Sequence, residues 1–191
     1  MNPISFEISK KALALPPHPK MGKAGILITI DGPAGSGKTT LASEIASLIE
    51  REQKSVNQIH MDSLYNGWDG ALTNGMRTRM RNEILPEIVK GENFQLPSYD
   101  WLIDQWGEPQ SFHTADFTIL EGVGAGQKVS RPFASLSIWI EVSAELAMER
   151  VLERDGFHLE PQMKRWQKLE REHFTEEATK LAADYQLVGA P

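Results

Sequence analysis

The sequence contains no cysteine among its 191 residues. It therefore cannot form a disulfide bond, a thiolate metal site or a cysteine nucleophile, and we expect a cytoplasmic protein. It also lacks an apolar run as long as a membrane span, and no long apolar segment follows Lys10 and Lys11 near its start. We therefore expect neither a membrane segment nor a signal peptide.

Positive charge is also scarce relative to negative charge. The chain has 20 lysines and arginines against 26 aspartates and glutamates, which gives a formal net charge of −6. A protein with this balance has no broad basic surface for nucleic acid, so the positive charge needed to bind an anion must be concentrated locally. The sequence thus predicts neither nucleic acid nor a membrane as a partner, and it is compatible with a homo-oligomer.

The chain is long enough for one domain with a substantial core. We expect residues 23–191 to form this domain, with a small lid at about residues 154–165. Residues 1–22 are interpreted as an N-terminal leader, either packed at an edge or flexible. The reason is the proline-rich run at residues 16–19, which cannot form a helix or a central strand.

The most informative stretch is a glycine-rich segment between a strand pattern and a helix pattern. Residues 26–30 form a β-branched run typical of a buried parallel strand, and residues 41–49 repeat leucine and isoleucine at helical spacing. Between them, residues 32–39 match the phosphate-binding pattern G-x-x-x-x-G-K-T. Because strand and helix lie where this motif requires them, we favour a nucleotide site over a glycine-rich turn that binds nothing.

The chemistry of phosphate binding explains the residues of this loop. Glycines let backbone N–H groups turn inward around a phosphate, and the following helix points its positive N-terminal end at the same anion. Lys38 is expected to reach the β- and γ-phosphates of ATP, and the Thr39 hydroxyl to bind Mg²⁺. The predicted nucleotide-binding residues are Gly32, Pro33, Ala34, Gly35, Ser36, Gly37, Lys38, Thr39 and Thr40.

Strand and helix patterns alternate along the rest of the chain. Further strands are expected at residues 56–61, 117–122, 136–142 and 185–188. Helical stripes lie between them: around residues 76–88, where Pro86 predicts a kink or break, after a cap at Ser143, and from Pro161 onward. This alternation predicts an α/β fold, the three-layer sandwich of a P-loop NTPase, with about five parallel strands, helices on both faces and a short lid.

Two acidic residues follow strands at the edge where open α/β sheets bind ligands. Asp62 is expected to accept the proton of an attacking hydroxyl or to position Mg²⁺, with a turn-capping role as the alternative. Glu121 ends an apolar strand, as the acid of a Walker B element does, and the glycine-rich residues 122–126 predict a mobile turn after it. Thr39, Glu121 and Asp62 are the candidate metal ligands.

Two arginines precede the expected lid. Arg150 and Arg154 project from one helix face, from which they could neutralise a transferring phosphoryl group or simply face solvent. Residues 91–113 are irregular and aromatic, which suits a segment that stacks on a flat acceptor; a hydrophobic cluster under a loop is the alternative. Together these features predict a small-molecule phosphotransferase with a closing lid.

The order and spacing of several short motifs resemble the uridine kinase branch of P-loop kinases, over roughly residues 25–156. The motifs occupy residues 32–39, 61–65, 97–101, 119–122 and 150–155. In that family, such elements supply phosphate contacts, a catalytic base, acceptor contacts, a metal-site acid and lid arginines. The resemblance implies these roles for Asp62 as base, Tyr65, Tyr99 and Trp101 as acceptor contacts, Glu121 near Mg²⁺, and Arg150 and Arg154 in the lid.

The chain departs from that family's pattern around the acceptor. The family usually carries a histidine several residues after its Tyr-Asp element, where this chain has Asp104 and Trp106. The lid is short and lacks a second cluster of arginines; Arg165 is the nearby substitute and is therefore a candidate substrate contact. The identity of the acceptor stays open.

Three functions are compatible with these features. The first is an ATP-dependent kinase that phosphorylates a hydroxyl of uridine, cytidine or a similar small molecule. The second is a nucleoside monophosphate kinase of the cytidylate type, which residues 30–38 also resemble. Its acceptor would need a phosphate clamp such as Arg77, Arg79 and Arg81, which could equally be solvated charges. The third is a regulator that uses ATP to switch a partner, and such a protein would not need Asp62.

Overall fold

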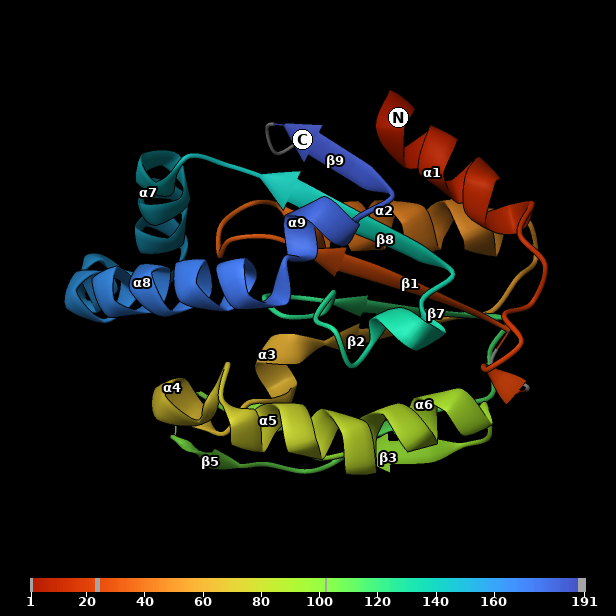
Figure 1. Cartoon of the computed structure of the whole chain (residues 1–191), viewed down its shortest axis with the longest axis horizontal. Helices are drawn as coiled ribbons and strands as arrows, with labels where there is room; N and C mark the ends of the chain where they lie inside the picture. The colour runs from red at the N-terminus through yellow and green to blue at the C-terminus, as the bar shows by residue number, and fades with distance from the viewer. Residues whose placement is uncertain (1, 23–24, 102, 189–191) are drawn as a thin grey trace.

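The computed structural model describes residues 2–22, 25–101 and 103–188. Its centre is a five-stranded sheet with the order β2-β7-β1-β8-β9, in which all neighbouring strands are parallel (Figure 1). The strands are β1 (Ile26–Asp31), β2 (Val56–His60), β7 (Phe117–Glu121), β8 (Leu136–Glu141) and β9 (Tyr185–Val188). The predicted α/β fold with about five parallel strands is confirmed.

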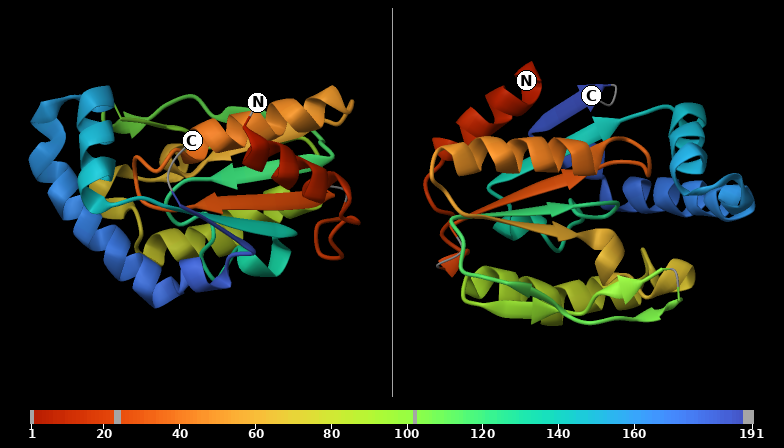
Figure 2. Two further views of the ribbon diagram at one scale, coloured as in Figure 1. Left: turned by 90° about the horizontal axis from the view of Figure 1, so that it is seen from above. Right: turned by 180° about the vertical axis from the view of Figure 1, so that it is seen from behind.

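One face of the sheet is covered by α2 (Lys38–Arg51) and α1 (Pro3–Leu13), as Figures 1 and 2 show. Ile8 of α1 is fully buried in the same core cluster as Leu41 and Ile45 of α2. The side chains of β1 that face this layer are isoleucines, which matches the run that identifies the strand in the sequence. This layer places the start of α2 at the carboxyl end of β1.

The segment interpreted from the sequence as a leader contains an ordered helix, α1. Its first turn is capped by Asn2, whose side chain accepts a hydrogen bond from the Ile4 N–H at 3.0 Å. The proline run at residues 16–19 argues against a helix only locally, because it comes after α1 and not inside it. The structure shows this segment as a helix packed on α2.

The opposite face is covered by the short segments α3 (Met61–Leu64), α4 (Gly67–Gly70), α5 (Asn74–Arg79), η2 (Met80–Ile84) and α6 (Leu85–Lys90). Thr73 caps α5 by accepting a hydrogen bond from the Met76 N–H at 3.2 Å. The irregularity expected at Pro86 is present: η2 is a π-helical turn, and Pro86 lies in the first turn of α6. Proline lacks the N–H donor that an unbroken helix requires there.

Residues 91–113 form two small antiparallel strand pairs beside α5 and α6 (Figure 1). In the first pair, β3 (Phe94–Leu96) lies against β6 (Gln110–Phe112). In the second, β4 (Tyr99–Asp100) lies against β5 (Gln105–Trp106). The prolines of this stretch correctly exclude long elements, and the pairing itself depends on contacts that the local sequence does not show.

The carboxyl end of the sheet faces two helices, α7 (Ala144–Asp155) and α8 (Glu160–Glu177) (Figure 1). Ser143 caps α7 as predicted, and Gly156, with a φ of 111°, ends it before the turn η4 (Phe157–Leu159). Two further helical turns are η3 (Arg131–Phe133) and α9 (Thr179–Ala182). In the part of the chain that the structure describes, no helix combines the length and the apolar character needed to cross a membrane.

Candidate active site

The phosphate-binding pattern folds into a loop that joins β1 to the first turn of α2. Gly35 has a positive φ of 78°, and a Cβ atom there would lie 2.6 Å from the carbonyl oxygen of Ala147 in α7. Glycine permits this close approach, so the loop and α7 pack directly against each other. Lys38 is buried and donates a hydrogen bond from Nζ to the Pro33 carbonyl oxygen at 2.8 Å.

Asp31, the last residue of β1, fixes this loop to the turn that follows β7. Its Oδ1 accepts hydrogen bonds from the N–H groups of Gly32 (2.7 Å) and Gly124 (2.9 Å), and its Oδ2 accepts one from Gly126 (2.8 Å). Burial raises the pKa of Asp31 to about 6, although these hydrogen bonds act in the opposite direction. The turn expected to be mobile is therefore buried and held at two N–H groups.

A carboxylate at the end of β7 meets the first turn of α2. Thr39 Oγ1 donates a hydrogen bond to Glu121 Oε1 at 2.9 Å. His60, the last residue of β2, places Nδ1 2.5 Å from the same oxygen, and this hydrogen bond raises the pKa of His60. The sheet register explains why these side chains lie close together. Ile30 of β1 and His60 of β2 both pair with Glu121 of β7, so the carboxyl ends of the three strands are aligned.

These oxygen donors fit a magnesium ion. Thr39, Glu121 and Asp62 line the same cleft, and hydroxyl and carboxylate oxygens are ligands that Mg²⁺ accepts. Within residues 2–22, 25–101 and 103–188, no group of three or more His, Cys, Asp or Glu side chains is arranged to hold a metal ion. A magnesium ion here would therefore need further oxygen ligands from a substrate, such as the phosphates of a nucleotide.

The cleft has a volume of about 850 Å³ and extends from the phosphate loop to α8. Its described walls include most of the residues singled out from the sequence: Ala34, Gly35, Gly37, Lys38, Thr39, Thr40, Asp62, Tyr65, Trp101, Glu121, Arg150 and Arg154. Gly32, Pro33 and Ser36 belong to the loop but are not among the described lining residues. Motifs far apart in the chain are thus brought to one site.

Asp62 lines the cleft from the first turn of α3. Asp62 is exposed to the open cleft, and partial desolvation by the protein atoms around its carboxyl raises the pKa of Asp62. The negative charge of Glu121 acts in the same direction, whereas the positive charges of Lys38 and Arg154 lower the pKa. A carboxylate with a raised pKa that lies near a phosphate loop is suited to accept a proton.

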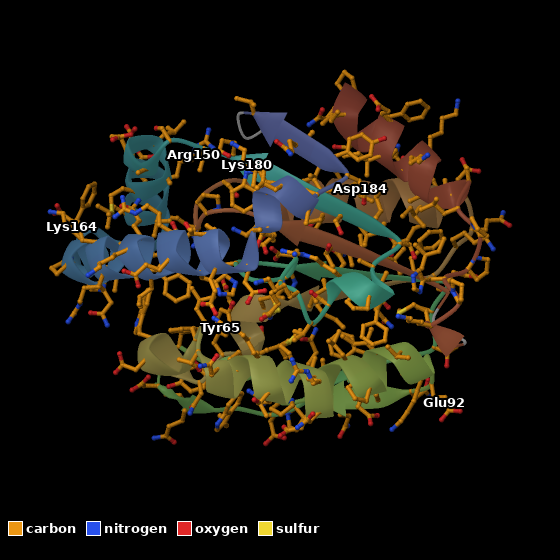
Figure 3. The ribbon with its side chains drawn as sticks, in the orientation of Figure 1. Tyr65, Glu92, Arg150, Lys164, Lys180 and Asp184 are labelled. Carbon is orange, nitrogen blue, oxygen red and sulfur yellow. The ribbon has the colours of Figure 1, made fainter. Side chains whose placement is uncertain are left out.

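The two predicted lid arginines approach the phosphate loop from α7. Arg150 lies on the cleft with Nη1 3.5 Å from the Gly35 carbonyl oxygen (Figure 3). Arg154 donates two hydrogen bonds of 2.7 Å to Asp155, and this pairing raises the pKa of Arg154. Both arginines line the cleft, Arg150 before the predicted lid and Arg154 at its start.

Three tryptophans form a wall of perpendicular rings beside Asp62. Trp68 lies edge-on to Trp101 (centroids 5.2 Å apart, 70°) and to Trp166 (5.6 Å, 79°). Trp101 donates a hydrogen bond from Nε1 to the Asp62 carbonyl oxygen at 3.0 Å. Tyr65 lies between α8 and the α3–α5 layer (Figure 3). The centroid of its ring is 6.1 Å from that of Trp166, and its hydroxyl donates a hydrogen bond to the Val123 carbonyl oxygen in the turn after β7.

Two predicted acceptor contacts lie away from the cleft. The Tyr99 hydroxyl donates to Asp104 at 2.5 Å, and its buried ring lies edge-on to Trp101 at 5.4 Å. Arg165 is exposed on α8 and hydrogen-bonds to Gln162. Neither Tyr99 nor Arg165 is among the described residues that line the cleft, so acceptor contact by them finds no support. Tyr99 instead packs against a residue of the wall, and Arg165 lies on the solvent face of its helix.

Two of the three arginines considered as a phosphate clamp, Arg77 and Arg79, are engaged elsewhere. Arg77 donates two hydrogen bonds to the Glu176 carboxylate of α8, at 2.7 and 2.6 Å. Arg79 donates to the Leu64 carbonyl oxygen at 2.6 Å and lies 4.6 Å above the centroid of the Trp106 ring. A monophosphate acceptor could use these two arginines only by displacing contacts that hold α5 to its neighbours.

Several cleft residues are not identified as site residues by the sequence pattern: Trp68, Val123, Val151, Asp155, His158, Leu159, Met163 and Trp166. The sequence does indicate one property of Trp166, because the helical spacing places it on the apolar side of the helix expected from Pro161 onward. The pattern assigns that side to the protein interior and does not distinguish a packed core from the wall of a cleft.

Comparisons with known proteins agree with this architecture. The uridine kinase of Ureaplasma parvum serovar 3 is 32% identical to the chain over 146 residues, which cover 70% of each sequence. The uridine kinase of Mycoplasma genitalium is 26% identical over 166 residues, covering 78% of this chain and 77% of its own length.

Solved structures share the fold. A possible uridine kinase from Bacillus stearothermophilus matches with a TM-score of 0.70 at 19% identity, covering 96% of this chain and 97% of that one. No family model matches the sequence.

Proposed function

The chain belongs to the uridine kinase family of P-loop kinases, and we propose that it transfers the γ-phosphate of ATP to a hydroxyl group of a nucleoside, such as uridine or cytidine, or of a similar small molecule. The observation that carries this proposal is a single cleft onto which Lys38, Asp62 and the tryptophan wall all open. A phosphate site, a proton acceptor and an aromatic surface are the parts that phosphorylation of a neutral acceptor requires.

The phosphate loop supports ATP as the donor. Lys38 Nζ is bound to a neutral backbone carbonyl, so an incoming phosphate offers it a stronger, charge-assisted partner. The N–H groups at the start of α2 add a favourable site for negative charge. Arg150 and Arg154 supply further positive charge from the α7 side, where it would offset charge on the group in transfer.

Thr39 and Glu121, which line the same cleft as Asp62, would hold Mg²⁺. A bound magnesium ion supplies charge neutralisation and orientation of phosphate oxygens. The protein's contribution is to fix the ligands in advance. The Thr39 hydroxyl is directed at Glu121, and His60 contacts the same carboxylate oxygen.

Asp62 is the proposed catalytic base. The acceptor hydroxyl oxygen forms a bond to the γ-phosphorus, its proton passes to the Asp62 carboxylate, and the bond from the γ-phosphorus to the bridging oxygen breaks to release ADP. The raised pKa of Asp62 makes it a better proton acceptor near neutral pH than an ordinary aspartate.

The tryptophan wall supports a flat or partly apolar acceptor such as a nucleoside. The monophosphate alternative has less support, because Arg77 and Arg79 already bind groups of the protein. A regulatory ATP switch would explain the phosphate loop but not the carboxylate and the aromatic wall beside it.

The proposal is tested by measuring Mg·ATP-dependent ADP release against a panel of nucleosides, nucleoside monophosphates and sugars. Stimulation by uridine or cytidine is the expected result. Stimulation by monophosphates alone would replace this proposal with the cytidylate-type alternative. Binding of ATP without stimulation by any member of the panel would contradict the nucleoside assignment.

A further inference from the structure

A buried carboxylate on α8 has no role in the transfer proposed above. Glu170 is 3% exposed, and its Oε2 accepts a hydrogen bond from the Ala34 N–H of the phosphate loop at 3.1 Å. Trp166 lies one turn earlier on the same helix, and its interaction with this carboxyl acts to lower the pKa of Glu170. One side chain therefore contacts both the loop that is expected to bind phosphate and a ring of the acceptor wall.

Charged groups face Glu170 from the elements packed around it. Lys38 of α2 favours its ionised form, whereas Asp31 at the end of β1 opposes it. Glu170 in turn raises the pKa of the buried Tyr65 hydroxyl. Burial has the largest effect and raises the pKa of Glu170 to about 7. An apolar side chain of similar volume would avoid this cost, so packing alone does not account for a carboxyl here.

We propose that Glu170 is a positioning residue that couples the acceptor wall to the phosphate loop. A displacement of the Trp166 ring by an acceptor changes its interaction with Glu170, and this change reaches the Ala34 N–H through the hydrogen bond that the carboxyl accepts from it. The inference rests on the proposed function, because it assigns the tryptophan wall to the acceptor. It explains why one helix contributes to both halves of the cleft.

Four variants separate this role from simple packing. Glu170→Met keeps the volume and removes both carboxyl oxygens, and Glu170→Gln is the conservative variant that retains an acceptor oxygen. Trp166→Phe keeps a ring on the wall and removes its N–H donor. Glu172→Gln is the matched control, since it lies on the same helix with a side chain that is 63% exposed.

The first readout needs no ligand. Amide hydrogen exchange of residues 31–37 in the nucleotide-free protein is expected to be roughly tenfold faster in Glu170→Met, as expected for loss of a buried hydrogen bond. Glu170→Gln should restore part of the protection, and Glu172→Gln should match the wild type. Tryptophan emission of the wild type should titrate near pH 7, and this transition should be absent in both Glu170 variants.

The second readout is the Kd for Mg·ATP. Trp166→Phe should accelerate loop exchange, and it should shift the Kd for Mg·ATP in the same direction as Glu170→Met does. In the double variant, loop exchange and Kd should each differ little from those of the single variant with the larger effect. Unchanged loop exchange in Glu170→Met, or a wild-type loop and Kd in Trp166→Phe, would overturn the coupling. If the wild type bound no Mg·ATP, the proposed function would fail, while the exchange data would still decide whether Glu170 links loop and wall.

Discussion

The hydroxyl of Thr39 donates a 2.9 Å hydrogen bond to Oε1 of Glu121, and so joins the start of α2 to the carboxyl end of β7. The same carboxylate oxygen lies 2.5 Å from Nδ1 of His60. The candidate magnesium ligands are therefore held in place by the protein itself. Such preorganisation lowers the cost of assembling the site when a nucleotide arrives.

Thr39→Val removes this hydroxyl while nearly preserving the shape of the side chain. We expect turnover to fall roughly 10- to 100-fold, the range seen when support of a metal site is lost, and half-maximal activity to need more Mg²⁺. A magnesium titration of the rate measures this. Thr175→Val, an exposed position on α8, is the control. Identical magnesium dependence in both variants would argue against metal binding by Thr39.

Gly35→Ala is expected to destabilise the protein and weaken ATP binding. The added Cβ would meet the Ala147 carbonyl oxygen at 2.6 Å, and the positive φ of 78° alone costs about 1–2 kcal/mol for a residue with a side chain. Gly75→Ala is the control, because it lies within α5 and its Cβ would meet only the Thr73 hydroxyl at 3.5 Å among described atoms. Urea unfolding of both variants measures the difference, and equal stability would disprove the close contact.

The pH dependence of stability should report Glu170. Its pKa is about 7 in the fold against 4.5 as an ordinary glutamate, so the folded state favours the protonated form. Its contribution to stability is then fully present below pH 4.5 and is lost as the pH rises through 7.

Replacing this ionisable group should remove that loss. The stability of wild type relative to Glu170→Gln should fall, on the order of 3 kcal/mol, between pH 4.5 and pH 8. Urea unfolding at several pH values gives both curves. Parallel curves would show that Glu170 does not titrate in this window.

Trp68→Ala is expected to raise the KM for the acceptor about tenfold and to leave the Kd for Mg·ATP within about twofold, because it removes the ring at the corner of the wall. Trp106→Phe is the control, since Trp106 is 43% exposed and is not among the described lining residues. Steady-state kinetics with the acceptor found in the panel measure both. An equal effect of the two substitutions would contradict the wall as the acceptor site.

The parts of the fold that the sequence predicts are those encoded locally. The buried strands appear as β-branched runs, and the phosphate loop appears as a contiguous motif with a strand before it and a helix after it. Caps such as Ser143 are also visible in the sequence, because their hydrogen bonds span three residues. The acceptor wall is different, since it is assembled from α4, the turn after β4, and α8.

The face of α8 shows where the sequence pattern reaches its limit. On α8 the apolar residue Leu169 is 43% exposed, whereas the ionisable residue Glu170 is buried and only 3% exposed. Glu170 can be buried because Ala34, distant in the chain, donates a hydrogen bond to it. A helix pattern cannot reveal a partner of this kind.

The most direct test of Asp62 as the catalytic base is to measure kcat and the Kd for Mg·ATP of Asp62→Asn. Asp69→Asn is the control, because Asp69 is exposed and lies in the next short helix, α4. If Asp62 is the catalytic base, kcat should fall roughly 10²- to 10⁴-fold, and the Kd for Mg·ATP should change little. Wild-type turnover in Asp62→Asn would contradict the proposed mechanism. A large loss of Mg·ATP affinity would instead make Asp62 a magnesium ligand and not the base.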